Sequence, residues 1–134
     1  MNPHLHTIIA IISSFITSLA CAPLAIRLAY KVGAVDRPDE RKVHARTMPR
    51  LGGLAIFIAF IVAVAAFTDL QGPVLGIVLG GSIIFLVGIL DDIFQLSPGV
   101  KLAGQCLAAA AAMRLGIQVH FLTNPFDGML ELGY

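Results

Sequence analysis

Two adjacent carboxylates, Asp91 and Asp92, directly follow an apolar run at residues 74–90. A carboxylate at a helix C-terminus faces the negative end of the helix dipole, and neighbouring carboxylates repel each other, so this position is unfavourable without a cation. Mg²⁺ is usually bound by one or two carboxylates together with substrate phosphates and water. The pair therefore predicts a metal site in which Asp91 and Asp92 are the ligands.

Lys101 and Gln105 are the next polar side chains that could face this pair. They stand four residues apart at the start of an expected helix, so they share one face of it. Across a short loop this face would oppose both carboxylates. The alternative interpretation is a solvated loop in which the aspartates pair with Lys101 and bind no metal.

The basic loop at residues 31–50 supplies a second group of candidates. Arg binds phosphate with two parallel hydrogen bonds, Lys supplies a compact positive charge, and His exchanges a proton near neutral pH. The substrate-binding candidates in this loop are Arg41, Lys42, His44 and Arg50. Carboxylates for a metal and cations for phosphates are the equipment of phosphoryl transfer. The alternative is a loop that sets membrane orientation and binds anionic lipid headgroups.

The composition indicates a multi-pass membrane protein. Of 134 residues, 57% are hydrophobic and 13% charged, whereas a soluble domain has about 25% charged residues. The balance of nine basic against eight acidic residues gives no reason to expect a nucleic-acid partner. The apolar runs predict a single all-α domain over residues 1–134, with four transmembrane helices at about 7–30, 51–67, 74–90 and 98–115. For the last run, a soluble core helix is the alternative.

The charge distribution predicts the orientation in the membrane. The loop at residues 31–50 holds six basic residues, and the loop at 68–73 holds none. The positive-inside rule then places residues 31–50 in the cytoplasm. With four spans, both termini face outward, and the second cytoplasmic loop is 91–101. The two polar loops therefore meet on one side of the membrane.

Small residues predict how the third and fourth helices pack. Gly72, Gly76 and Gly80 recur every four residues, a spacing that lets membrane helices approach closely. The alanines at residues 108–112 give the next helix a similarly slim surface. Beyond Gly116, alternating apolar residues around two turn-like pairs predict a short outward-facing β-hairpin.

Three motifs carry a resemblance to a known family. They are Asp36-x-Pro38-x-x-Arg41-Lys42-x-His44, Pro49-Arg50-x-Gly52-Gly53, and Gly88-x-x-Asp91-Asp92-x-x-x-Leu96 with Lys101 and Gln105. In these motifs the chain resembles the N-terminal portion of the polyprenyl-phosphate N-acetylhexosamine-1-phosphate transferases, glycosyltransferase family 4. The basic loop is more similar to the undecaprenyl-phosphate GlcNAc-1-phosphate branch than to the phospho-MurNAc-pentapeptide branch.

The resemblance implies a reaction and a location. A sugar 1-phosphate, expected to be GlcNAc-1-phosphate, would pass from a UDP-N-acetylhexosamine to undecaprenyl phosphate in cell-envelope polysaccharide biosynthesis. Asp91 and Asp92 match the family's paired aspartates and would be the catalytic residues, with Mg²⁺ as cofactor and Mn²⁺ as the alternative ion. The enzyme would be a multi-pass protein of the plasma (inner) membrane with its active face in the cytoplasm.

Family members continue through further spans that carry a later Asp-containing loop and a His-rich loop, which these 134 residues lack. We therefore expect a truncated domain that is inactive alone: a truncated product, a fragment, or half of a site that another polypeptide completes. A homodimer is the alternative to such a complementing chain. Two other classes of protein fit the residues. One is a small multispan cation transporter or channel subunit that uses Asp91 and Asp92. The other is a non-catalytic membrane protein that binds a lipid phosphate.

Overall fold

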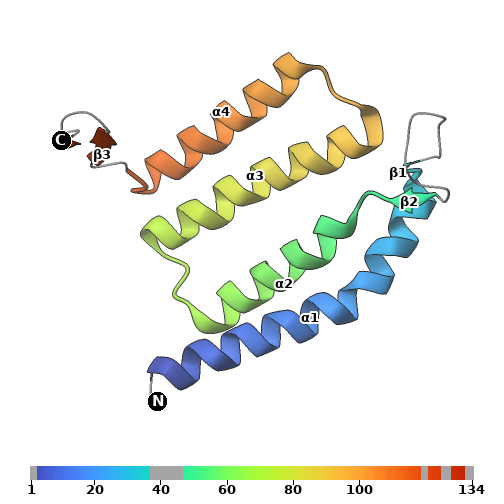
Figure 1. The fold of residues 1–134 in the computed structure, drawn as a ribbon, viewed down its shortest axis with the longest axis horizontal. Coiled ribbons are helices and arrows are strands. Elements are labelled where there is room, and N and C mark those ends of the chain that lie inside the picture. Colours follow the sequence, from blue (N-terminus) through green and yellow to red (C-terminus); the bar gives the residue numbers. More distant parts are fainter. Residues whose placement is uncertain (1–2, 37–46, 119–120, 125–127, 132–134) are drawn as a thin grey trace.

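Four helices arranged as two antiparallel hairpins form most of the fold. The computed structural model describes residues 3–36, 47–118, 121–124 and 128–131. The helices are α1 (Pro3–Val32), α2 (Gly52–Phe67), α3 (Gly72–Phe94) and α4 (Pro98–Arg114). Figure 1 shows them side by side in one layer. The helix α1 packs along α2, and α3 packs along α4, whereas the backbones of α2 and α3 approach less closely.

Two short antiparallel sheets accompany the helices. The strand β1 (Val35–Asp36) pairs with β2 (Met48–Pro49), in the register Val35 to Pro49. The strand β3 (Phe121–Asn124) pairs with β4 (Gly128–Glu131), which is the C-terminal hairpin expected from the sequence. The first sheet was not predicted, because two-residue strands are too short to produce an alternating pattern. The fold is therefore mostly helical instead of all-α.

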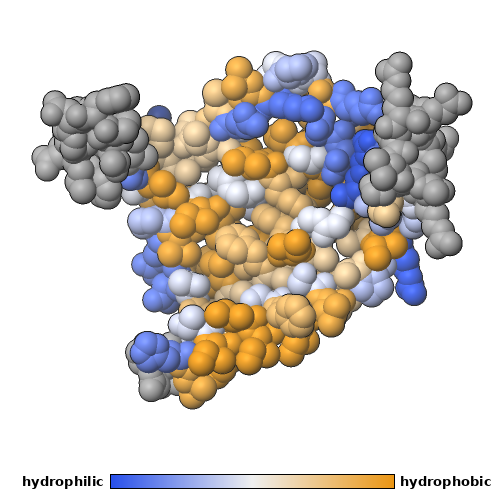
Figure 2. Space-filling model, in the orientation of Figure 1, coloured by the Kyte–Doolittle hydropathy of each residue, from blue (hydrophilic) through white to orange (hydrophobic). Residues whose placement is uncertain are grey.

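Small side chains fill the contacts between the helices. The buried apolar residues of the described segments are mainly alanines, including Ala25 and Ala29 on α1 and Ala55 and Ala59 on α2. Large apolar side chains such as Phe15 on α1 are exposed. This inverts the arrangement of a soluble core and is typical of helices that pack within lipid. Figure 2 shows hydrophobic residues covering α1 and the middle of the layer, with hydrophilic residues mainly toward the helix ends.

The predicted contact between α3 and α4 is present, with one exception and one addition. A Cβ atom on Gly76 would lie 3.2 Å from the Ala112 carbonyl oxygen, and one on Gly80 would lie 3.2 Å from the Ala108 carbonyl oxygen. Gly72 has nothing within 4 Å and instead has φ +51° at the helix start. Gly104, which was not predicted, completes the contact, since a Cβ there would meet Val87 Cγ2 at 2.5 Å.

Two helices of the described segments are long and apolar enough to cross a membrane. They span His4–Val32 and Gly72–Phe94. The helix α2 is equally apolar but has 16 residues, and α4 has 17, so both are at or below the lower limit of about 17 for a spanning helix. Length and composition thus support two of the four expected spans.

The helix topology brings the predicted polar loops to one end of the layer. Because the helices are antiparallel, α1 and α3 end where α2 and α4 begin, and the β1–β2 sheet lies at this same end (Figure 1). Residues 37–46 lie outside the described segments, but both flanking strands are at this end.

Candidate functional site

The paired aspartates lie on the last turn of α3. The sequence placed them in a loop at residues 91–101, and this is wrong, since α3 continues to Phe94. Ile89 and Ile93 explain the extension because they pack against a buried cluster of Ala29, Ala34 and Leu51. This contact holds the last turn of α3 against the junction of α1 and α2.

Asp91 organises the end of α3. Its backbone carbonyl accepts a hydrogen bond of 2.8 Å from the Gln95 N–H, and its Oδ1 accepts one of 3.0 Å from the Leu96 N–H. Gln95 occupies the left-handed region at φ 53° and ψ 66°, an arrangement that closes helices but favours glycine. The chain therefore reverses around the Asp91 carboxylate and holds it in place.

Asp91 lies in a hollow between α3 and α4, which we call the α3–α4 hollow. Its Oδ1 forms an ion pair of 2.8 Å with Lys101 Nζ. The hollow has a volume of about 180 Å³ and is lined by Ile84, Val87, Gly88, Asp91, Lys101 and Gln105. The expected association of an aspartate with Lys101 and Gln105 is present for Asp91.

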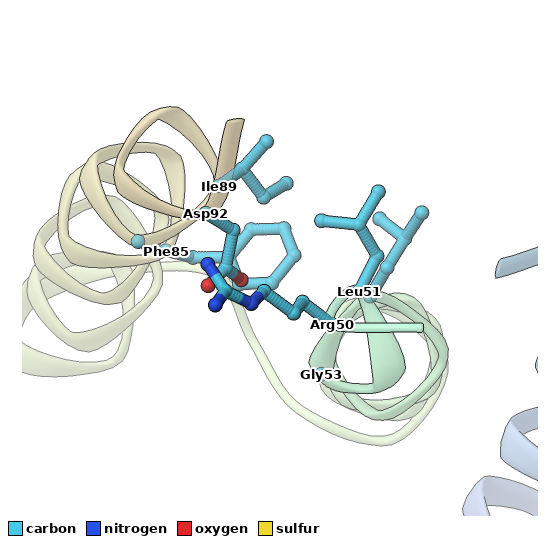
Figure 3. A pocket seen from close by; sticks show the side chains of 8 residues that line it. Arg50, Leu51, Gly53, Phe85, Ile89 and Asp92 are labelled. Carbon is cyan, nitrogen blue, oxygen red and sulfur yellow. The ribbon is translucent and has the colours of Figure 1, made fainter. Parts of the chain in front are cut away.

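Asp92 lies in a different hollow, between α2 and α3, which we call the α2–α3 hollow. Its volume is about 230 Å³, and its lining residues are Arg50, Leu51, Gly53, Leu54, Phe85, Gly88, Ile89 and Asp92. Figure 3 shows Arg50 and Asp92 extending into it from opposite walls. Consecutive residues of an α-helix point about 100° apart, so the two aspartates cannot both face α4. The expectation that both oppose Lys101 and Gln105 is therefore wrong for Asp92.

The first sheet positions Arg50. Its backbone N–H donates to the Ala34 carbonyl at 2.9 Å, next to the paired strands. Its Nη2 lies 3.1 Å from Asp36 Oδ1. Asp36 was quoted only as part of a motif and was missing from the predicted site residues. An acidic side chain within a basic loop could have indicated in the sequence that Asp36 pairs with one of the neighbouring cations.

The arrangement fits a divalent cation that takes one or two ligands from the protein and the others from phosphate groups and water. Among the described residues, no group of three or more His, Cys, Asp or Glu side chains converges. Asp92 forms no ion pair within these segments, whereas one oxygen of Asp91 is committed to Lys101. Mg²⁺ commonly uses one or two carboxylates and completes its shell with phosphates and water. The two half-buried carboxylates suit that mode of binding and not an all-protein cage.

Arg41, Lys42 and His44 lie outside the described residues. Of the predicted site residues within them, the structure brings Asp91, Lys101 and Gln105 into one hollow and Asp92 and Arg50 into the other. Both hollows are at the same end of the helices, and Gly88 lines both.

Comparison with known proteins gives a consistent set of relatives. The chain is 41% identical over 131 residues to a probable undecaprenyl-phosphate N-acetylglucosaminyl 1-phosphate transferase of Bacillus subtilis, covering 95% of the chain and 36% of the relative. It is 32% identical to a decaprenyl-phosphate N-acetylglucosaminephosphotransferase of Mycobacterium tuberculosis, covering 91% of the chain and 32% of the relative. An undecaprenyl-phosphate alpha-N-acetylglucosaminyl 1-phosphate transferase of Thermotoga maritima is 38% identical over 75% of the chain and 30% of the relative.

These relatives are considerably longer than the chain, which spans about a third of their length. No solved structure matches the chain. Residues 74–134, which include Asp91, Asp92 and Lys101, match the family described as glycosyl transferase family 4. Residues 74–134 are therefore similar to glycosyl transferase family 4, and most of the chain is similar to the N-terminal part of polyprenyl-phosphate N-acetylglucosamine-1-phosphate transferases.

Proposed function

We propose that the chain is part of a Mg²⁺-dependent transferase that moves GlcNAc-1-phosphate from UDP-GlcNAc to undecaprenyl phosphate. The observation that carries the proposal is the convergence, at one end of an apolar helical layer, of two aspartates with Arg50, Lys101 and Gln105. The names of the relatives indicate the acceptor and the transferred sugar phosphate.

The residues divide the chemistry between them. In the proposed reaction, an oxygen of the lipid phosphate forms a bond to the sugar-linked phosphorus of the donor, and the bond from that phosphorus to UMP breaks. Arg50 and Lys101 supply positive charge to phosphate oxygens, and Asp91 and Asp92 would hold the cation. A bound Mg²⁺ would neutralise charge that develops on the phosphate oxygens. The ion pair with Asp91 orients Lys101 toward the site.

The proposed orientation places this end of the helices in the cytoplasm, at the surface of the plasma membrane. Arg27, Lys31 and Lys101 lie in the halves of their helices nearest this end, and Arg50 lies just before α2 at the same end. The loop between α2 and α3 carries Asp69 and no basic residue. This asymmetry follows the positive-inside rule. In this proposal all four helices cross the bilayer, with α2 and α4 extended at their ends by flanking residues.

A chimera tests the activity. The aligned segment of the Bacillus subtilis relative is replaced by this chain, and release of UMP from UDP-GlcNAc is measured with undecaprenyl phosphate and Mg²⁺. We expect turnover that falls at least about a hundredfold in Asp91→Asn or Asp92→Asn. Asp69→Asn, the same change at the opposite end of the helices, should leave turnover unchanged. Full turnover in both aspartate variants would contradict the proposal.

The same assay tests the isolated chain, which we expect to be inactive until a complementing polypeptide is supplied. UMP release by the isolated chain that is abolished by Asp91→Asn would disprove the inactivity and support the assigned chemistry.

Cysteine labelling tests the orientation. In a background with Cys21 and Cys106 replaced by alanine, single cysteines are placed at Thr47, Gln95 and Asp69, all exposed positions. A membrane-impermeant maleimide should label positions 47 and 95 in inverted vesicles and position 69 in intact cells. Labelling of positions 47 and 95 from opposite sides would refute the proposed site.

A further inference from the structure

Gly88 is the one lining residue that the α2–α3 hollow and the α3–α4 hollow share. It lies three residues before Asp91 and four before Asp92, so all three positions adjoin on the surface of α3. Gly88 therefore lies one helical turn before both aspartates, with Asp91 in the hollow toward α4 and Asp92 in the hollow toward α2.

Gly88 is also free of packing constraints. A Cβ atom built there would meet nothing within 4 Å. Gly76, Gly80 and Gly104 differ, because a Cβ on each would press against α4 or a side chain of α3. Helix packing thus explains those three glycines and does not explain Gly88. A glycine within a helix lowers its stability. Gly81 also has open space around it, and what sets Gly88 apart is that it lines both hollows.

Each hollow holds one cation and one carboxylate. The α2–α3 hollow has Arg50 and Asp92, and the α3–α4 hollow has Lys101 and Asp91. The formal charges of these four groups cancel. A single phosphate could contact either Arg50 or Lys101. A ligand with two linked phosphates could reach toward both cations, provided that no side chain stood between the hollows. Such a polyanion would enter together with a divalent cation, because the site itself carries no net positive charge.

We infer that the two hollows form one bipartite site for a diphosphate group with its divalent cation, and that Gly88 joins them because it has no side chain. The inference rests on the proposed function for the identity of the ligand class. It adds a positioning residue, Gly88, and a division of the aspartates between two phosphate positions. A side chain at residue 88 would stand between the hollows and separate them.

Binding of simple phosphates tests this inference without any turnover. The whole chain in detergent micelles with Mg²⁺ is titrated calorimetrically with inorganic pyrophosphate and, separately, with inorganic phosphate. We expect pyrophosphate to bind about tenfold or more tightly than phosphate, the gain from one additional charge-assisted hydrogen bond. Gly88→Val should bring the two affinities close to equality, mainly by weakening pyrophosphate binding, and Gly88→Ala should have an intermediate effect.

Gly81 provides the matched control. It lies on α3, outside both hollows, and a Cβ there also meets nothing within 4 Å. Gly81→Val and Gly81→Ala should keep the preference for pyrophosphate, and circular dichroism should show the same helix content in all variants. Lys101→Met should weaken pyrophosphate binding, whereas Arg114→Met, at the opposite end of α4, should not.

Three results would overturn the inference. They are equal binding of phosphate and pyrophosphate by the unmodified chain, an undiminished preference in Gly88→Val, and an equal loss in Gly81→Val. A failure of this inference can be distinguished from a failure of the proposed function. A chimera that releases no UMP, together with a pyrophosphate preference that depends on Gly88, would refute the transferase proposal alone. An active chimera with no role for Gly88 would refute only this inference.

Discussion

The contact between α3 and α4 provides two neighbouring glycines that should respond oppositely to the same substitution. A Cβ on Gly80 would lie 3.2 Å from the Ala108 carbonyl oxygen and 3.3 Å from Ala112 Cβ. Gly81 is the next residue, and a Cβ there has nothing within 4 Å. Neither the carbonyl oxygen nor the Ala112 Cβ can rotate away, so alanine at residue 80 requires the helices to separate.

The expected magnitudes follow from two opposing contributions. Replacing a helical glycine by alanine stabilises a helix by about 0.5–1 kcal/mol, and this contribution applies to both positions. Overpacking a close contact costs about 1–3 kcal/mol, and this applies only at Gly80. Gly81→Ala should therefore raise the free energy of unfolding by about 0.5–1 kcal/mol. Gly80→Ala should be less stable than Gly81→Ala by about 1–3 kcal/mol.

Equilibrium unfolding in mixed micelles, with increasing sodium dodecyl sulfate and helix content followed by circular dichroism, measures this difference. Both variants gain the same helix propensity and unfold in the same detergent mixture. The difference between their free energies of unfolding therefore reports the packing at Gly80 alone. A Gly80→Ala variant as stable as Gly81→Ala would show that α3 and α4 do not pack through this glycine.

Further predictions concern the end of α3 and the contact between the hairpins, and the same unfolding assay measures each. Gln95→Gly should stabilise the protein by about 1 kcal/mol, because glycine adopts the left-handed conformation without steric cost; a loss of stability would contradict the assigned helix end. Lys101→Met should cost no more than about 1 kcal/mol, because Lys101 and Asp91 are 41% and 32% exposed and solvent screens their ion pair. A larger cost would mean that the pair is buried. Phe57 and Phe85 stack with ring centroids 3.9 Å apart, so a double-mutant cycle with leucine at both positions should give a coupling of about 0.5–1.5 kcal/mol. Additive effects would exclude a direct contact.

The sequence predicted the features that repeat along the chain. Continuous apolar runs indicated the four helices, and the spacing of Gly76 and Gly80 indicated which face of α3 approaches α4. The described ends of the two predicted polar loops lie at one end of the layer, because the helices are antiparallel. These features depend on periodicity and topology, which a sequence records directly.

The details of the site depended on contacts between distant residues. The extension of α3 to Phe94 comes from Ile93 packing against a cluster that includes Ala29 and Leu51, far away in the sequence. The separation of Asp91 from Asp92 follows from that extension, since residues in a helix point in fixed directions whereas loop residues need not. The ion pair of Arg50 with Asp36 likewise depends on a two-residue strand pair that leaves no pattern.

The walls of the two hollows differ in how they are held. The α3–α4 hollow lies within one hairpin, whose helices are in contact through Gly76, Gly80 and Gly104. The α2–α3 hollow lies between the hairpins, where contact depends on larger side chains such as Phe57 and Phe85. A movement of one hairpin relative to the other would widen or narrow the hollow around Asp92, and it would leave the surroundings of Asp91 unchanged. The end of α3 therefore borders one hollow of fixed width and one hollow whose width can vary.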